Sequence, residues 1–307
     1  MALTTNLELQ REAQRGKYAV GAFNTSNLEI TQAILEAAVE CRSPVIVATS
    51  QSAIEYAGIQ VLSDLIRTLA RPLAIPVSLH LDHGTDYDII VGCLRHGWTS
   101  VMIDGSHAPL EENIAMTSEI VKMAHAVGVS VEAELGRLIG IEDHISVQVD
   151  QAHLTEPEEA VRFVSETACD ALAVAIGTSH GAYKFKGKPQ LDFDRLKAIV
   201  QKVQTPLVLH GASSVKGEMV ERGAKYGAKL SGAAGVPEEH IRKAVSLGIT
   251  KVNIDTDLRL TFTTETRKFL QEHPEIFDPR KILAASRQAM KEVVKEKIEL
   301  LGSAGRA

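Results

Sequence analysis

The chain has 307 residues, of which 45% are hydrophobic and 23% are charged, a composition typical of a globular protein with a large buried core. Its net charge at pH 7 is −6, and it has no long basic run that could neutralise a phosphate backbone, which argues against a nucleic-acid partner. The chain lacks an N-terminal signal pattern and any run of about 18 apolar residues, so we expect a cytoplasmic protein that does not enter the membrane.

Short apolar runs alternate with longer segments of helical periodicity, a pattern typical of βα units that build a parallel sheet. The predicted strands are Tyr18–Phe23, Pro44–Thr49, Pro76–Leu81, Ser100–Asp104, Val129–Leu135, Ala171–Ile176, Pro206–His210 and Ile249–Ile254. The predicted helices between them are Leu28–Cys41, Gly58–Leu73, Asp86–His96, Leu110–Val127, Glu156–Glu166, Phe193–Val203 and Glu238–Leu247. Eight such strands predict an α/β protein, a (β/α)8 TIM barrel with residues 1–307 in one domain. Two more predicted helices, Asp257–Glu272 and Arg280–Leu301, form a C-terminal extension at about 257–301.

The alternative fold is an open doubly wound sheet, which normally carries a glycine-rich phosphate turn after its first strand. Here that turn is Asn24-Thr25-Ser26, so the closed barrel is favoured. The segments Gly136–His153 and Gly181–Gln190 are long for loops of a βα unit, and we predict that they act as lids. The last six residues, 302–307, have little to bury and are expected to fray.

Polar and charged residues gather at the carboxyl ends of the predicted strands, which meet at the catalytic face of such a barrel. They are Asn24, Ser50, Asp82, His83, Asp104, Glu132, Glu134, His180, His210, Asn253 and Asp255. His83, His180 and His210 end three different strands, and each precedes a glycine. They predict a three-histidine zinc site with an open position for substrate. The three cysteines form no CxxC pair and so predict no thiolate site.

Two glutamates strengthen this prediction, because Glu132 and Glu134 lie two apart on one strand and point to the same side. Buried carboxylates need a cation or a histidine partner, which a metal site beside Asp104 would supply. The segments 211–214 and 253–256 follow the last two strands, where barrels commonly bind phosphate with backbone N–H groups and hydroxyls. The residues alone therefore predict a metal-dependent barrel enzyme that acts on a phosphorylated substrate.

Six segments, in this order, resemble class II fructose-bisphosphate aldolases of the class IIB branch. They are His80-Leu81-Asp82-His83-Gly84, Asp104-Gly105-Ser106, Glu132-Ala133-Glu134-Leu135-Gly136, Gly177-Thr178-Ser179-His180-Gly181, His210-Gly211-Ala212-Ser213 and Asn253-Ile254-Asp255-Thr256. The resemblance spans about residues 1–301. It implies reversible zinc-dependent cleavage of fructose 1,6-bisphosphate into dihydroxyacetone phosphate and glyceraldehyde 3-phosphate. The branch also contains tagatose-bisphosphate aldolase, whose substrate differs only in configuration at C4, so that sugar remains the alternative.

The resemblance also implies the metal ligands. His83, His180 and His210 would hold the catalytic zinc, with cobalt as an alternative ion, and Asp104 and Glu134 would serve a second or alternative metal position. The family further binds a monovalent cation, Na⁺, K⁺ or NH₄⁺, through backbone carbonyls near residues 179–181 and 211–213.

The proton carriers follow from the same resemblance. Asp82 would donate a proton to the oxygen on C4, and Glu142 in the long loop would move the C3 proton. Asn24, Glu132 and His80 are expected to surround and orient the ligands.

The resemblance also implies the substrate contacts. Dihydroxyacetone phosphate would be bound by Gly181, Gly211, Ala212, Ser213, Asn253, Ile254, Asp255 and Thr256. Ser50 would contact the aldehyde. Arg259 would reach the far phosphate of a neighbouring subunit's substrate, which implies a homodimer or a homotetramer.

Three other functions remain as alternatives. A Schiff-base aldolase needs a desolvated lysine at the active face, but Lys251, the only strand lysine, lies early in its strand and is expected toward the opposite end. A zinc hydrolase could use the same three histidines to activate water. A non-catalytic metal-binding scaffold would leave the convergent acidic and phosphate-binding groups without a purpose.

Overall fold

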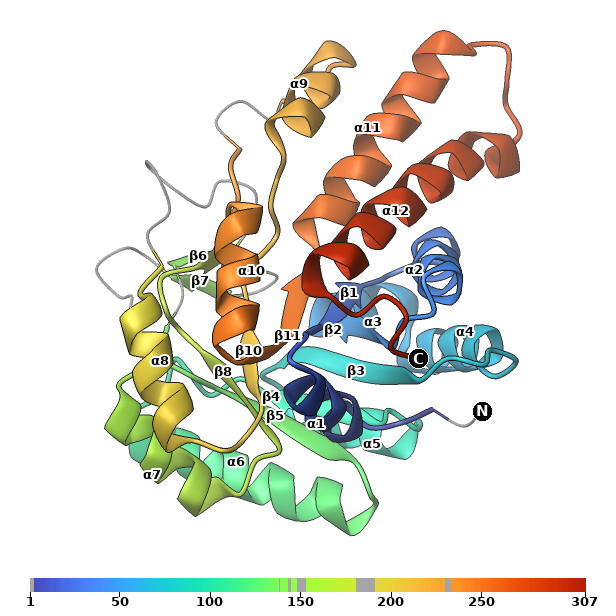
Figure 1. Cartoon of the computed structure of the whole chain (residues 1–307). Helices are drawn as coiled ribbons and strands as arrows, with labels where there is room; N and C mark the ends of the chain where they lie inside the picture. The colour runs from blue at the N-terminus through green and yellow to red at the C-terminus, as the bar shows by residue number, and fades with distance from the viewer. Residues whose placement is uncertain (1–2, 138, 143–144, 148–152, 181–190, 230–232) are drawn as a thin grey trace.

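The computed structural model describes residues 3–137, 139–142, 145–147, 153–180, 191–229 and 233–307. Its centre is a closed barrel of eight parallel strands (Figure 1), which confirms the predicted TIM barrel. The strands are β1 (Val20–Asn24), β2 (Val45–Ser50), β3 (Val77–Gly84), β4 (Ser100–Ile103), β5 (Ser130–Leu135), β8 (Ala171–Val174), β10 (Leu207–Leu209) and β11 (Ile249–Ile254). Their order around the barrel is β1-β11-β10-β8-β5-β4-β3-β2, so each strand lies beside its neighbours in sequence.

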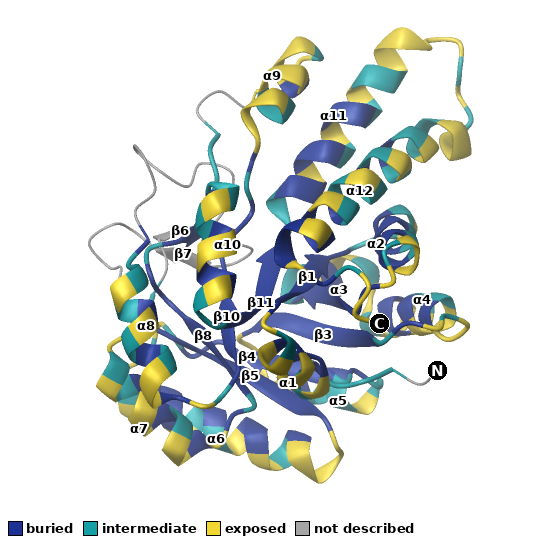
Figure 2. Ribbon diagram, viewed as in Figure 1, coloured by how far each residue is buried: buried dark blue, intermediate teal, exposed yellow. Residues whose placement is uncertain are grey.

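All the predicted helices are present. They are α2 (Leu28–Glu40), α4 (Ile59–Ala70), α5 (Tyr87–Arg95), α6 (Leu110–Ala126), α7 (Pro157–Thr167), α8 (Phe193–Lys202), α10 (Glu238–Leu247), α11 (Thr256–Glu272) and α12 (Pro279–Leu301). Their buried faces are turned toward the strands or toward neighbouring helices, as Figure 2 shows. Helices α11 and α12 form an antiparallel hairpin, and α12 also packs against α2. Among the described residues, no helix combines the length and apolarity needed to cross a membrane.

Three helices were not predicted: α1 (Asn6–Gly16), α3 (Gln51–Ala57) and α9 (Gly217–Lys225). Helix α1 begins at Thr5 with a capping box that Glu8 completes. Its buried face contains two polar residues, Asn6 and Gln10, beside the apolar ones. This weakens the hydrophobic periodicity, although Thr5 and Glu8 three residues later are a helix-start signal that the sequence does contain.

The long segment after β5 contains regular structure that was also not predicted. β6 (Ile139–Glu142) pairs antiparallel with β7 (Ile145–Val147) and parallel with β9 (Ser179–His180). This small sheet therefore joins the segment after β5 to the segment after β8. The lid predicted at residues 181–190 lies outside the described residues.

The expectation that residues 302–307 fray is wrong. Ser303 is fully buried, and its hydroxyl accepts a hydrogen bond from Ser43 at 2.9 Å. The amides of Gly305 and Ala307 donate to carbonyls of the segment after α2, both at 2.9 Å. The tail therefore forms backbone hydrogen bonds although it has little apolar surface, and hydrophobicity alone does not reveal such pairing.

The barrel interior is polar toward the carboxyl ends of the strands. Residues two apart on a strand share a face, so one side chain in two points into the barrel. Small apolar residues such as Ala22, Ala173 and Val208 fill the apolar part of this space. The polar interior residues are His80, Asp82, Glu132, Glu134, His210, Lys251 and Asn253, all buried. Polar side chains from β3, β5 and β11, together with that of His210 after β10, thus share one desolvated space.

Candidate active site

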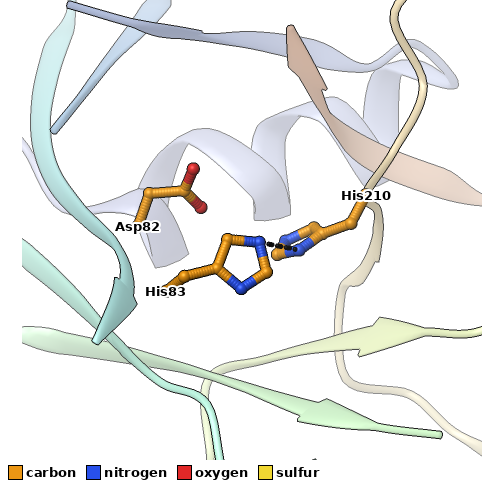
Figure 3. A group of neighbouring side chains, drawn as sticks. All are labelled: Asp82, His83 and His210. Carbon is orange, nitrogen blue, oxygen red and sulfur yellow. Dashed lines mark hydrogen bonds between the residues drawn. The ribbon is translucent and has the colours of Figure 1, made fainter. Parts of the chain in front are cut away.

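His83 and His210 face each other across the barrel mouth (Figure 3). His83 Nε2 lies 3.0 Å from His210 Nδ1, and both side chains are almost fully buried. His210 follows β10, whereas His83 lies near the end of β3. Two ring nitrogens directed at one point in the barrel are the arrangement expected of metal ligands.

A bulge in β3 places both Asp82 and His83 in the site. The register with β4 shifts between Leu81 and Gly84, where β3 holds one extra residue, and His83 has a left-handed backbone with φ of +48°. Consecutive residues of a regular strand point to opposite faces, so only one of the two would otherwise enter the barrel. A left-handed conformation is uncommon outside glycine and is found at functional sites. The sequence pattern gave no sign of this bulge.

The outer nitrogen of each histidine ring contacts a carboxylate. His83 Nδ1 donates to Asp104 Oδ2 at 2.8 Å, and His210 Nε2 donates to Glu132 Oε1 at 2.9 Å. These bonds place a proton on His83 Nδ1 and on His210 Nε2, so His83 Nε2 and His210 Nδ1 are the nitrogens that a metal ion would bind. At the usual zinc–nitrogen distance of about 2.0–2.1 Å, two tetrahedral ligands lie about 3.3 Å apart, close to the spacing found here. The residues therefore fit a zinc ion.

Burial and neighbouring charges shift the pKa values of His83 and Glu134. Burial lowers the pKa of His83, but the negative charges of Asp82 and Asp104 outweigh it and raise the pKa to about 10. Burial and the charge of Asp104 raise the pKa of Glu134. A divalent cation would replace the proton on His83 and balance the acidic groups around it.

The carboxylates of Glu134 and Asp104 form a second set of possible metal ligands beside His83. Glu134 Oε2 lies 3.3 Å from His210 Nδ1 and 3.8 Å from His83 Nδ1. The ligand atoms of His83, Asp104 and Glu134 lie within 4.8 Å of one another, as do those of Asp82, His83 and His210. Two overlapping sets of ligand atoms thus share His83, which suits a metal with two alternative positions.

Asp82 is an ionised carboxylate beside the two histidines. Its Oδ2 accepts from Asn24 Nδ2 and its Oδ1 accepts from Asn253 Nδ2, both at 2.8 Å. Burial would raise the pKa of Asp82, but the positive charges of His83, His210 and Lys251 hold it below its usual range. The carboxylate is therefore a proton acceptor at neutral pH.

The loop after β10 lies against the N-terminus of α11. The Ser213 hydroxyl accepts from the Asp255 amide at 3.3 Å, which joins the two segments predicted to bind phosphate. The Asp257 carboxylate accepts from the amides of Ser214 and Val215 at 2.9 and 2.7 Å, and Lys297 Nζ lies 3.1 Å from Asp257. Asp257 and Lys297 were not predicted. Asp257 matches the preference for acidic residues in a first helical turn, and Lys297 falls on the apolar face of α12, three residues after Val294 and four before Leu301.

The remaining predicted site residues either bond to nearby parts of the chain or are not described by the structure. Ser50 caps α3, since its Oγ accepts from the Ala53 amide at 3.3 Å. Arg259 is more than half exposed on α11 and pairs with its own Asp255 at 2.8 Å. Gly181 and the side chains of His180 and Glu142 lie outside the part of the chain that is described.

Comparison with known proteins decides the family. The model of the family described as "Fructose-bisphosphate aldolase class-II" matches residues 4–306. The chain is 54% identical over 305 residues to a fructose-bisphosphate aldolase of Thermus caldophilus, covering 99% of this chain and 100% of that one. It is 49% identical over 300 residues to one from Helicobacter pylori, covering 97% and 98%. The chain belongs to the class II fructose-bisphosphate aldolase family.

Solved structures agree with this assignment. The YdjI aldolase from Escherichia coli K12 superposes with a TM-score of 0.80 at 32% identity, covering 99% of both chains. As a member of the class II family, the chain is an enzyme, a lyase of the aldolase type whose substrates are phosphorylated sugars. Class II enzymes generally depend on zinc, and the two buried groups of ligand atoms around His83 suit such an ion.

The position of Lys251 argues against the Schiff-base alternative. Its backbone lies in the first half of β11, as expected, but its amine reaches further than predicted. Nζ lies 2.8 Å from Glu132 Oε1 and 3.4 Å from His80 Nε2, and the side chain has no exposed surface. A Schiff base needs a free amine that the substrate carbonyl can approach, whereas this amine is enclosed and ion-paired.

Proposed function

We propose that this enzyme reversibly cleaves fructose 1,6-bisphosphate into dihydroxyacetone phosphate and glyceraldehyde 3-phosphate, with a zinc ion held by His83, His180 and His210. The observation that carries the proposal is the approach of His83 Nε2 to His210 Nδ1 beside the Asp82 carboxylate. Zinc bound there supplies a Lewis acid for the carbonyl of the ketose. Asp104 and Glu134 would offer the second metal position.

Asp82 moves the proton of the C4 hydroxyl. Because its carboxylate is ionised at rest, it accepts this proton in the cleavage direction and returns it in the condensation direction. The two asparagine amides that hold its oxygens fix its orientation. Glu142 carries the C3 proton in the same scheme, from the end of β6.

The phosphate of the dihydroxyacetone half binds at the loop after β10 and the first turn of α11. Gly211, Ala212 and Ser213 lie on the loop, while Asn253, Ile254, Asp255 and Thr256 lead into the helix. Within the described residues, Asp255 at the start of α11 makes no side-chain capping hydrogen bond, and the N–H groups of a helix N-terminus favour an anion. Gly181 would contribute from the neighbouring loop.

A monovalent cation would bind close to this phosphate. The Ser179 carbonyl and Gly211 are in close contact, since a Cβ added to Gly211 would lie 2.6 Å from the Ser179 oxygen. Carbonyls of these two segments, with those near Gly181 and Ser213, would provide the oxygen ligands that such an ion prefers.

The remaining assignments concern the assembly and the location of the enzyme. Ser50 would contact the aldehyde half, and Arg259, exposed on α11, would reach the far phosphate of a substrate in a neighbouring subunit. We therefore propose a homodimer or a homotetramer, and a place in the cytoplasm.

Chelation tests this proposal. Treatment with a strong chelator should abolish cleavage of fructose 1,6-bisphosphate, and zinc or cobalt should restore it. His83→Ala should remove the metal, whereas His273→Ala, at an exposed position after α11, should keep it. Undiminished cleavage after complete metal removal, or release of inorganic phosphate in place of triose phosphates, would overturn the proposal. Measuring cleavage of tagatose 1,6-bisphosphate beside fructose 1,6-bisphosphate decides which sugar is preferred.

A further inference from the structure

A buried lysine contacts the metal site without reaching the substrate. We propose that Lys251 is a positioning residue, which acts through Glu132 to fix the ring orientation and the tautomer of His210. The inference rests on the proposed role of His210 as a zinc ligand.

Two donors share one carboxylate oxygen. Lys251 Nζ and His210 Nε2 both donate to Glu132 Oε1, at 2.8 and 2.9 Å. Lys251 and Glu132 have no exposed side-chain surface, and that of His210 is 1%. These side chains are shielded from bulk solvent, so the position of the shared oxygen determines where the Nε2–H bond of His210 points. That bond in turn directs Nδ1 toward His83.

The amine of Lys251 also contacts His80. Lys251 Nζ lies 3.4 Å from His80 Nε2, and His80 Nδ1 lies 2.9 Å from Ser100 Oγ. Burial and the charge of Lys251 lower the pKa of His80 to about 3, so its ring is neutral and Nε2 accepts from the amine. A continuous series of hydrogen bonds therefore runs from β4 through β3, β11 and β5 to the histidine that follows β10.

Stability alone does not explain this arrangement. Replacing a buried ion pair by apolar residues of similar volume is often neutral or stabilising, because desolvation of the charges offsets their attraction. A buried carboxylate without a countercharge, however, is strongly unfavourable. Glu132 is needed at His210, and Lys251 is the cation that contacts the bonded oxygen. The lysine therefore allows a negative charge to sit behind a metal ligand.

The test measures zinc affinity of the metal-free protein by competition with a chromophoric chelator. Lys251→Met should weaken zinc binding by about 10- to 100-fold, as is typical for residues behind a metal ligand. Glu132→Gln should have a similar effect. Because both act through one hydrogen bond, the double variant should bind zinc no more weakly than Glu132→Gln alone. Additive losses, or unchanged affinity in Lys251→Met, would overturn the inference.

A spectroscopic measurement separates positioning from general loosening of the fold. The visible absorption of the cobalt-substituted protein reports ligand geometry and should shift in Lys251→Met. The matched control is Lys291→Met, which removes a largely buried lysine of α12 that is ion-paired with Glu40 of α2, away from the site. It should lower the melting temperature but leave the zinc affinity and the cobalt spectrum unchanged. Equal spectral changes in both variants would contradict a specific role for Lys251.

Two further variants keep the test decisive. If Lys251→Met fails to fold, Lys251→Gln, which retains an N–H donor but no charge, takes its place with the same expected loss of zinc affinity. His210→Ala tests the underlying assignment. If His210→Ala binds zinc normally, the proposed ligand role fails, whereas if it loses zinc while both Lys251 variants bind normally, only the role of Lys251 fails.

Discussion

The two oxygens of Asp82 make this residue the most informative position to change. Each accepts a hydrogen bond from a buried asparagine amide, so the carboxylate is held in one orientation beside the paired histidines. Asp82→Ala removes the proton acceptor and leaves the amides of Asn24 and Asn253 without their acceptor. We expect the variant to retain zinc, since the ring nitrogens of His83 and His210 are unchanged.

The magnitude follows from the two roles of the carboxylate. Loss of a positioned acid or base costs about 10²- to 10⁴-fold in rate, or about 2.7 to 5.4 kcal/mol in the activation barrier. Each buried amide left unpaired costs about 1 to 3 kcal/mol of folding stability. Asp82→Asn keeps the shape and one acceptor oxygen, so it should lose as much activity but less stability. Comparing the two variants therefore separates catalysis from packing.

Two assays divide the reaction at the step that needs Asp82. Cleavage of fructose 1,6-bisphosphate, followed through the triose phosphates, should fall by about 10²-fold or more. Exchange of the C3 proton of dihydroxyacetone phosphate with deuterated water does not involve the C4 oxygen and should continue. Full cleavage activity in either variant, or an equal loss in both reactions, would refute this role for Asp82.

Three further predictions concern the phosphate loop, the barrel interior and the tail. Gly211→Ala, at φ of +59° with its new Cβ 2.6 Å from the Ser179 oxygen, should lower kcat/KM by about 10- to 100-fold, whereas Gly217→Ala, in open space, should leave it unchanged. Burial and the charge of Lys251 lower the pKa of His80 from 6.5 to about 3 in the folded protein. The unfolded state therefore binds the proton first, and the free energy of unfolding should fall below pH 6.5 by up to about 1.4 kcal/mol per pH unit. His80→Gln should flatten that slope in denaturant titrations between pH 6.5 and 4, and an unchanged slope would contradict the assignment. Deleting residues 305–307 should cost about 1 to 3 kcal/mol of unfolding free energy through two lost backbone hydrogen bonds, which an unchanged denaturation midpoint would disprove.

The sequence by itself determined the barrel. Apolar runs of strand length alternate with helical periodicity, and both patterns depend on near neighbours, so all eight strands and the predicted helices were found. The same reasoning brought polar residues at strand ends to one face, because parallel strands of a barrel end together. His83, His210, Asp82 and Glu132 are accordingly in contact.

The tertiary structure decided which side chains touch. The bulge at His83, which turns two consecutive residues into the site, depends on the register with β4 and leaves no local pattern. The C-terminal tail forms hydrogen bonds through its backbone, which residue hydrophobicity does not encode. Lys251 lies in the first half of β11, yet its long side chain brings the amine to Glu132, which is 119 residues earlier in the chain. Such contacts depend on distances across the barrel, and those are set only when the barrel closes.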